Sequence, residues 1–293
     1  MIPISLTSID HKKGPCYARH LAQTLHRGED YLLQIDSHMR FRPCWDEYLI
    51  QQLSKTECPE KTVLTTYPPG YDPPLGPGSM AETRATVLVP WKFEDGILRQ
   101  KGRLLAYDYQ HASPNNNIPC LLYAGGFNFS HSSILEICPY ESTLHGLFFG
   151  EEISMAVRLF THGIDLYAPP QTVCYHLWKR NSLRIKVEKD PYRVKQKEIS
   201  LDIVRRQLKG LGKGIGNVRS VEQFSDKVGV DFENQTLATG CEDAGLHASS
   251  FVSSINSCYI LDDIANAKID KGERKSDDMR SVLALVSQFI SEA

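Results

Sequence analysis

The stretch that decides the fold is YLLQIDSHMRFRPCWDEYL, which runs from Tyr31 to Leu49. It begins with the apolar run YLLQID, which is typical of a short and largely buried strand ending at Asp36. A charged loop follows, and a helix is expected from about Trp45. The order strand, charged loop, helix predicts an α/β domain whose chemistry lies at the carboxyl end of a strand.

The flanking sequence extends this pattern in both directions. Ala18, Leu21, Ala22 and Leu25 form one apolar stripe, which predicts a helix over residues 16–27 that ends at Gly28. The other expected elements are strands over 85–93, 96–107, 120–130, 164–170 and 172–180, and helices over 150–163, 192–209 and 279–290. The strand over 120–130 carries a Gly-Gly break, which allows the backbone to approach another group closely.

Composition narrows the class of protein. The chain has 293 residues, of which 41% are hydrophobic and 23% charged, as expected for a soluble globular protein. The net charge of -2 gives no basic field for general nucleic-acid binding. The eight cysteines form no CxxC pair, which favours reduced thiols over a zinc site. No signal-peptide core or run of ~20 apolar residues is found, so we expect a cytoplasmic protein without membrane contact, or a secretory one if an N-terminal anchor precedes this sequence.

Asp36 and His38 are the first candidate metal ligands. Residues two apart in an extended segment point to the same side, so both side chains could reach one ion. A carboxylate oxygen and an imidazole nitrogen suit Mn²⁺ or a similar divalent ion. The alternative is a capping aspartate beside a surface histidine. Their position directly after an apolar strand, where ligand sites concentrate in α/β proteins, favours the metal site.

Two further groups of polar residues follow apolar segments. His176 alone is a structural histidine, but beside Lys179 and Arg180 it could complete a site for a metal and a diphosphate. Glu151 and Glu152 open the helix over 150–163 directly after a glycine. They are either a favourable placement of acidic residues at a helix N-terminus or carboxylates that accept hydrogen bonds from sugar hydroxyls.

Four segments carry a family resemblance. They are residues 14–50, which include GPCYARHLAQTLHRG, and residues 124–170, 174–180 and 210–232. Together they resemble the GlcNAc-type glycosyltransferases of family 60, and in particular cytoplasmic transferases that place α-linked N-acetylglucosamine on hydroxyproline of a ubiquitin-ligase adaptor. The family is also similar to the mucin-type polypeptide GalNAc-transferases, which bind Mn²⁺ through Asp-x-His and a later histidine. Asp36, His38 and His176 match those positions.

The resemblance implies a fold and an activity. The fold would be GT-A-like, with a mixed, mainly parallel sheet that binds a nucleotide-sugar at its carboxyl edge. The activity would be metal-dependent, retaining transfer of N-acetylglucosamine from UDP-GlcNAc to a protein hydroxyl on hydroxyproline, serine or threonine, with Mn²⁺ or Mg²⁺. No catalytic base is assigned. The residues expected to contact the donor or the reacting groups are Arg19, Gly125, Gly126, Glu151, Glu152, Lys179 and Arg180.

The predicted organisation is a GT-A-like domain over residues 1–235 and a C-terminal extension of unknown role over 236–293. Asp36 lies close to the start, so we expect the N-terminal part of the nucleotide site to be missing. A second hypothesis is therefore an inactive binding or scaffold protein with the same fold. A third is a metal-dependent hydrolase, against which the lack of an HExxH motif argues. The sequence leaves the choice between GlcNAc and GalNAc open.

Overall fold

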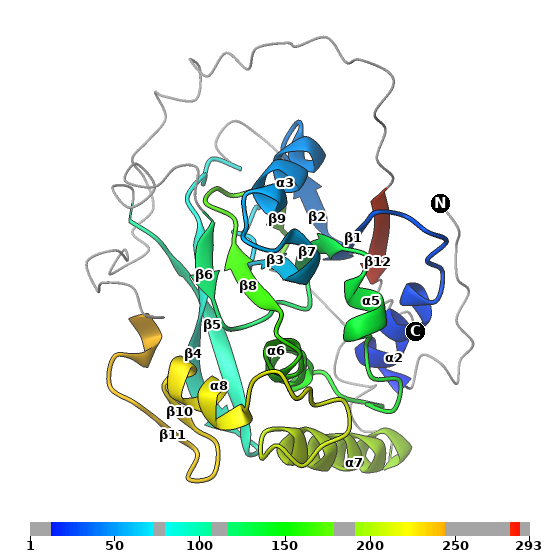
Figure 1. Ribbon diagram of the computed structural model, residues 1–293, viewed down its shortest axis with the longest axis vertical. Helices are drawn as coiled ribbons and strands as arrows, with labels where there is room; N and C mark the ends of the chain where they lie inside the picture. Colours follow the sequence, from blue (N-terminus) through cyan, green and yellow to red (C-terminus); the bar gives the residue numbers. More distant parts are fainter. Residues whose placement is uncertain (1–12, 73–79, 107–116, 179–190, 244–281, 288–293) are drawn as a thin grey trace.

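The computed structural model describes residues 13–72, 80–106, 117–178, 191–243 and 282–287. Its centre is a six-stranded mixed sheet with the strand order β12-β1-β7-β3-β8-β6 (Figure 1). Four strands, β12, β1, β3 and β8, run in one direction, and β7 and β6 run in the other. The strands are β1 (Tyr31–Asp36), β3 (Thr62–Thr65), β6 (Ile118–Cys120), β7 (Phe127–His131), β8 (Asp165–Ala168) and β12 (Val282–Ser287).

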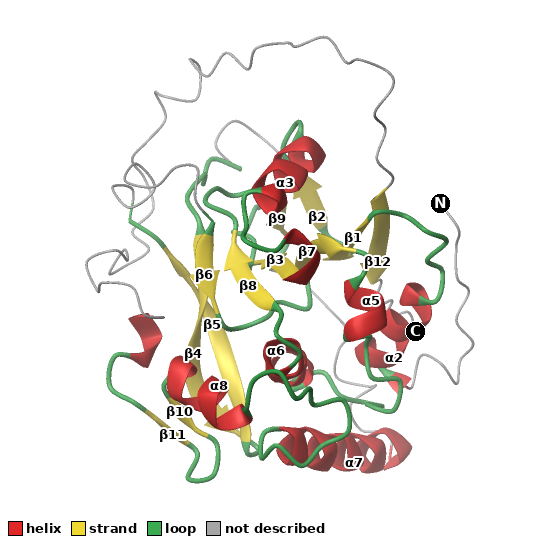
Figure 2. Cartoon of the chain, viewed as in Figure 1, coloured by secondary structure: helices red, strands yellow, loops and turns green. Residues whose placement is uncertain are grey.

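In the described part of the chain, three two-stranded sheets accompany the central one (Figure 2). The pair that matters most for the site is β2 with β9, which are antiparallel. A longer hairpin joins β4 to β5 through Asp95 and Gly96, both at positive φ, as a tight turn requires. The strands are β2 (Met39–Phe41), β4 (Thr86–Glu94), β5 (Ile97–Leu104), β9 (Cys174–His176), β10 (Val230–Asp231) and β11 (Thr236–Leu237).

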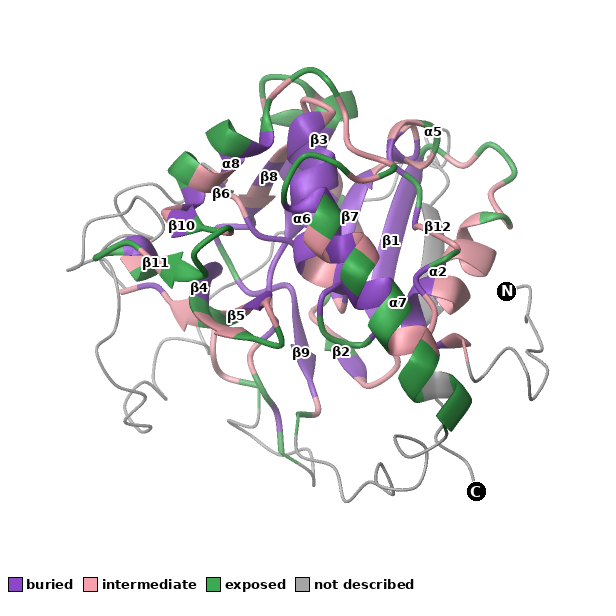
Figure 3. Ribbon diagram, turned by 90° about the horizontal axis from the view of Figure 1, so that it is seen from below, coloured by how far each residue is buried: buried purple, intermediate pink, exposed green. Residues whose placement is uncertain are grey.

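The helices differ in how deeply they are buried. Almost every residue of α6 is buried, whereas exposed and buried residues alternate along α7, which packs against α6 (Figure 3). Figure 3 also shows β1 and β7 buried over most of their length. The α-helices are α2 (Pro15–Gln23), α3 (Trp45–Ser54), α5 (Ile134–Ile137), α6 (Glu151–Thr161), α7 (Pro191–Gln207) and α8 (Val221–Val228), and short 3₁₀ turns span Pro59–Lys61 and Cys241–Asp243.

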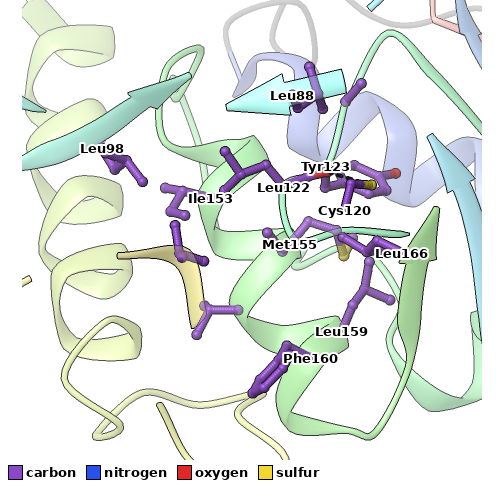
Figure 4. Close-up of a cluster of buried hydrophobic side chains, with 14 of the residues drawn as sticks. Leu88, Leu98, Cys120, Leu122, Tyr123, Ile153, Met155, Leu159, Phe160 and Leu166 are labelled. Carbon is purple, nitrogen blue, oxygen red and sulfur yellow. Dashed lines mark hydrogen bonds between the residues drawn. The ribbon is translucent and has the colours of Figure 1, made fainter. Parts of the chain in front are cut away.

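Two apolar clusters pack against the central sheet. The larger cluster surrounds α6 and includes Leu122, Met155 and Leu166 (Figure 4). The smaller cluster joins Leu33 and Ile35 of β1 to Leu49 and Leu53 of α3 and neighbouring strands. Because strand side chains alternate between faces, the remaining polar residues of β1 point the other way. Gln34 and Asp36 therefore share the face toward α2 and α6.

Most of the expected elements are present. The strand ending at Asp36, the helix from Trp45 and the helix over 150–163 are confirmed as β1, α3 and α6. The strands expected over 85–93 and 96–107 are β4 and β5, and they pair as a hairpin. The expected polar helix over 192–209 is confirmed as α7, which spans Pro191–Gln207. The helix expected over 16–27 is shorter, because α2 ends at Gln23 and residues 24–27 form turns. The α/β class and the mixed sheet are confirmed.

Two expectations are wrong. Residues 120–130 do not form one strand, because residues 121–126 leave the sheet. Their backbone amides bond side chains instead: Ala124 N donates to Thr65 and Gly125 N to Glu152. Within the segment 279–290, expected to be helical, residues 282–287 form strand β12, which pairs in parallel with β1. A short apolar run does not distinguish a helix from a strand by periodicity alone, so the pairing with β1 decides.

Other expectations concern the domain boundary, the cysteines and membrane contact. The hairpin of β10 and β11 lies across residue 235, and the division of the chain there stays a prediction. The seven cysteines in the described part of the chain are free thiols, and Cys258 lies outside it. Among the described residues, no helix has the length and apolar character needed to cross a membrane.

Candidate functional site

The three predicted metal ligands lie at the ends of two strands and in the turn between β1 and β2. Asp36 ends β1, and His176 ends β9. The pairing of β2 with β9 sets Met39 opposite His176, and Leu177 N donates to His38 O at 3.1 Å. As a result, Nε2 of His176 lies 3.8 Å from Oδ2 of Asp36, and the rings of His38 and His176 are 6.4 Å apart at their centroids. The chain thus brings all three side chains together.

The chemistry of this cluster fits a divalent ion, although its side chains are not arranged around one. Among the described residues, no three His, Cys, Asp or Glu side chains form a complete metal-binding group. The donor types, one carboxylate and two imidazoles, suit Mn²⁺. Ser37 Oγ lies 2.7 Å from Nδ1 of His38, a contact of the kind that orients histidine ligands.

Arg19 joins this cluster to the start of α6. Its side chain is buried, with 6% of the residue exposed. One amino group donates to Oδ1 of Asp36 at 3.2 Å, and the other donates to Oε1 of Glu151. A buried guanidinium between two carboxylates balances charges that would otherwise be costly to bury. The helix α2 therefore supplies the cation that links Asp36, one of the predicted metal ligands, to Glu151.

Glu151 is the more buried of those glutamates, with 3% exposed. Gly150 precedes it at φ 110°, a left-handed conformation that favours glycine, and α6 begins immediately afterwards. Besides Arg19, the Tyr140 hydroxyl donates to Oε1 at 2.8 Å. Glu151 is thus an ion-paired carboxylate held in the interior.

Glu152 has a different set of partners and is only half-buried. Gly125 N donates to Oε1 at 2.9 Å, while the Tyr67 hydroxyl and Gln100 Nε2 donate to Oε2, the latter at 3.2 Å. Burial raises the pKa of the Glu152 carboxyl, and the bonds from Tyr67 and Gly125 oppose that shift. Burial and the neighbouring Glu152 likewise raise the pKa of Tyr67.

The two predicted glycines are needed where they lie. A β-carbon on Gly125 would sit 2.5 Å from Oε1 of Glu151 and 2.7 Å from Arg19. A β-carbon on Gly126 would sit 2.8 Å from Oδ2 of Asp36. Gly126 O also accepts a hydrogen bond from Asp36 N at 2.9 Å. The close approach expected from the Gly-Gly pair is therefore an approach to the charged side chains of the site.

An exposed aromatic residue borders the site. Trp178 is 51% exposed, and its ring lies 4.3 Å from that of His176 and 5.9 Å from that of Tyr67. Its indole N–H donates to Pro68 O at 3.0 Å, which fixes the ring. The predicted diphosphate contacts Lys179 and Arg180 follow it in sequence and lie outside the described residues.

The sequence analysis did not single out several residues of this site, namely Gln34, Tyr67, Gln100, Tyr140 and Trp178. Gln34 had a signal, because it is the lone amide within an apolar strand. The others come from loops and from β5, and nothing in their local sequence distinguishes them.

In this α/β protein, a carboxylate and two histidines gather where β1 and β9 end, beside two further glutamates, and these are the residue types that a metal-assisted transferase or hydrolase would use. Comparison with known families decides between them. The sequence matches the glycosyltransferase (GlcNAc) family over residues 2–211, and the chain belongs to that family. The predicted resemblance to GlcNAc-type glycosyltransferases is thereby confirmed at the level of the family.

No curated protein sequence matches the chain. Among solved structures, a crystal structure of GalNAc-T7 with UDP, GalNAc and Mn²⁺ is similar, with a TM-score of 0.44 and 13% sequence identity. The similarity covers 80% of this chain and 43% of that one, so the chain spans less than half of that protein's length.

Proposed function

We propose that this protein is a metal-dependent, retaining glycosyltransferase that moves N-acetylglucosamine from UDP-GlcNAc to a protein hydroxyl. The observation that carries the proposal is the cluster of Asp36, His38 and His176 linked through Arg19 to Glu151, in a chain of the glycosyltransferase (GlcNAc) family. A divalent ion such as Mn²⁺ or Mg²⁺, held by those three residues, would neutralise charge on the diphosphate of the leaving UDP.

The chain's own residues have separate tasks in this proposal. Arg19 presents a fixed positive charge beside Asp36. This charge would stabilise the negative charge that develops on the leaving diphosphate. Gly125 and Gly126 let the backbone lie against the charged side chains, where a β-carbon would collide with them. Because Glu152 is the more accessible glutamate, we assign it the hydrogen bonds from sugar hydroxyls, and we assign Glu151 the task of holding Arg19.

The acceptor we propose is a hydroxyl on a cytoplasmic protein, with hydroxyproline first and serine or threonine next, and a ubiquitin-ligase adaptor as a candidate partner. Trp178 supports a peptide acceptor, because a fixed and exposed indole beside the site offers a flat apolar surface to a proline-type ring.

The test is transfer of labelled GlcNAc from UDP-GlcNAc, with Mn²⁺, to peptides that differ only in carrying hydroxyproline, proline or serine. Replacing the donor with UDP-GalNAc decides the sugar. We expect Asp36→Ala and His38→Ala each to lower turnover at least about 100-fold. Loss of a residue that only orients a metal ligand costs about 10- to 100-fold, and loss of the ligand itself should cost more. Glu47→Ala, an exposed carboxylate on α3, is the matched control. Unchanged turnover in both ligand variants would refute the metal assignment.

The second candidate function is a binding protein that keeps the fold without catalysis. It is favoured by the fact that the described His, Cys, Asp and Glu side chains form no complete metal-binding group. Isothermal titration with UDP distinguishes the two functions. Heat of binding that requires Mn²⁺ and disappears in Asp36→Ala supports the transferase, and no metal-dependent heat supports the binding protein.

A further inference from the structure

A buried chain of hydrogen bonds connects β1 to Glu151 through residues that have no role in the proposed transfer so far. It starts at Gln34, which is fully buried and lies on the same face of β1 as Asp36. Gln34 Nε2 donates to Gly125 O at 2.8 Å and to the Tyr140 hydroxyl at 2.9 Å. The Tyr140 hydroxyl in turn donates to Glu151 at 2.8 Å.

The groups at the two ends of this chain, the Gly125 carbonyl and the Glu151 carboxylate, determine which atoms donate and which accept. A backbone carbonyl can only accept, so the Gln34 atom that faces Gly125 O must be the amide nitrogen. The second hydrogen of that nitrogen points to the Tyr140 oxygen. The Tyr140 proton is then available for an acceptor, and a carboxylate accepts more strongly than a neutral hydroxyl. Glu151 is that acceptor, at a shorter distance than the Tyr123 hydroxyl, which lies 3.3 Å from Tyr140.

Tyr140 is also held from the side of α2. Its backbone N donates to Gln23 Oε1 at 2.8 Å, and its backbone O lies 3.1 Å from Nδ1 of His20. The helix that carries Arg19 therefore also fixes the residue that donates to Glu151. The path begins at Gln34, passes through Tyr140, Glu151 and Arg19, and returns to the same strand at Asp36, two residues further on.

We propose that Tyr140 and Gln34 are positioning residues, which hold the Glu151 carboxylate so that Arg19 stays against Asp36 in the donor site. The inference rests on the proposed glycosyl transfer. Without the Tyr140 hydroxyl, the carboxylate is held by Arg19 alone and can turn with it, and the positive charge is then less well placed where charge develops on the leaving group. Loss of the Tyr140 hydroxyl should therefore weaken the stabilisation of the transition state more than the binding of the donor, and it should lower kcat more than it changes KM.

The experiment compares Tyr140→Phe, Glu151→Gln and the double variant in the transfer assay. We expect Tyr140→Phe to lower kcat about tenfold and to change KM for UDP-GlcNAc less than about threefold. The double variant should lose no more than about twofold beyond Glu151→Gln, because the two residues act as one unit. If Tyr140 affected kcat by a route other than Glu151, the effects of the two substitutions would multiply.

Two further variants keep the test decisive. Tyr123→Phe removes an equally buried hydroxyl that contacts Gln34 and Tyr140 but not Glu151, and it should keep at least about half of kcat. Gln34→Met tests the same path from its other end if Tyr140→Phe does not fold, and it should lower kcat about threefold or more. Multiplying effects in the double variant, or equal losses in Tyr123→Phe and Tyr140→Phe, would overturn the inference. No turnover by the unaltered chain would overturn the proposed function and this inference with it.

Discussion

Glu151 and Glu152 are consecutive residues at the start of α6, yet their carboxylates are stabilised in opposite ways. Glu151 lies in a charged half of the site, where Arg19 balances it together with Asp36. Glu152 lies in a neutral half, where a backbone amide, a tyrosine and a glutamine surround it. Hydrogen bonds from neutral groups offset only part of the cost of burying its charge, and its pKa is therefore raised.

The difference shows how one short motif places two carboxylates in different environments, which suits the separate roles proposed for them. A carboxylate paired with a buried guanidinium is fixed in place by its partner. In the proposed function, Glu152 is held by neutral hydrogen-bond donors and is more accessible than Glu151, so its carboxylate would exchange one of those donors for a sugar hydroxyl. Environment, and not residue type, separates the two glutamates, and the following variants test each half in turn.

The largest expected effect is in the charged half. Arg19→Met leaves Asp36 and Glu151 without their shared cation, and we expect it to lower the free energy of unfolding by about 3–5 kcal/mol. Urea denaturation at neutral pH measures this change. Arg27→Met, at an exposed position just beyond α2, should cost less than about 0.5 kcal/mol. A loss below about 1 kcal/mol for Arg19→Met would mean that the two carboxylates do not depend on it.

A smaller effect is expected in the neutral half. Tyr67→Phe removes one hydroxyl donor from Glu152 and keeps the ring, so we expect a loss of about 1.5–3 kcal/mol in the same denaturation experiment. The control is Tyr192→Phe, an exposed tyrosine on α7. A loss as large as that of Arg19→Met would remove the distinction between the two halves.

The smallest effect is a pH dependence. Because the pKa of Glu152 is raised in the folded state, its contribution to stability is fully present below the ordinary carboxyl pKa of 4.5. It is lost as pH rises from there through the raised folded pKa. Glu152→Gln removes this dependence, so its stability relative to the unaltered chain should rise across that window, by at most about 1.4 kcal/mol per pH unit. Denaturation midpoints at successive pH values measure the slope, with Glu47→Gln as the control. Parallel pH profiles for Glu152→Gln and the unaltered chain would count against the raised pKa.

Single strands and helices, and the Gly-Gly pair, could be predicted from the residues within each segment. The apolar run before Asp36 predicted β1, the apolar stripe over residues 16–27 predicted α2, and the Gly-Gly pair predicted a close approach of the backbone. The resemblance placed Arg19, Asp36 and Glu151 in one site, and hydrogen bonds now connect them.

The partners of the two glutamates could not be predicted in the same way. Tyr67 and Gln100 lie 85 and 52 residues from Glu152, and only the folded chain brings them to it. Tyr140 is nearer in sequence to Glu151, but its loop carries no signal of a hydroxyl directed at a carboxylate. The identity of β12 as a strand depends likewise on its pairing with β1, which a short apolar run does not reveal.

That pairing has a consequence for the order of folding. Tyr31 of β1 lies opposite Val282 of β12, a separation of 251 residues (282 minus 31). Parallel pairs between such distant segments form slowly, because the entropy of closing the intervening chain is lost before the contact is gained. The strand that carries Asp36 therefore keeps one open edge during synthesis until the ribosome has released residues 282–287. An unpaired apolar strand is a template for association with other chains, so the nascent protein is exposed to aggregation at β1 until β12 pairs with it.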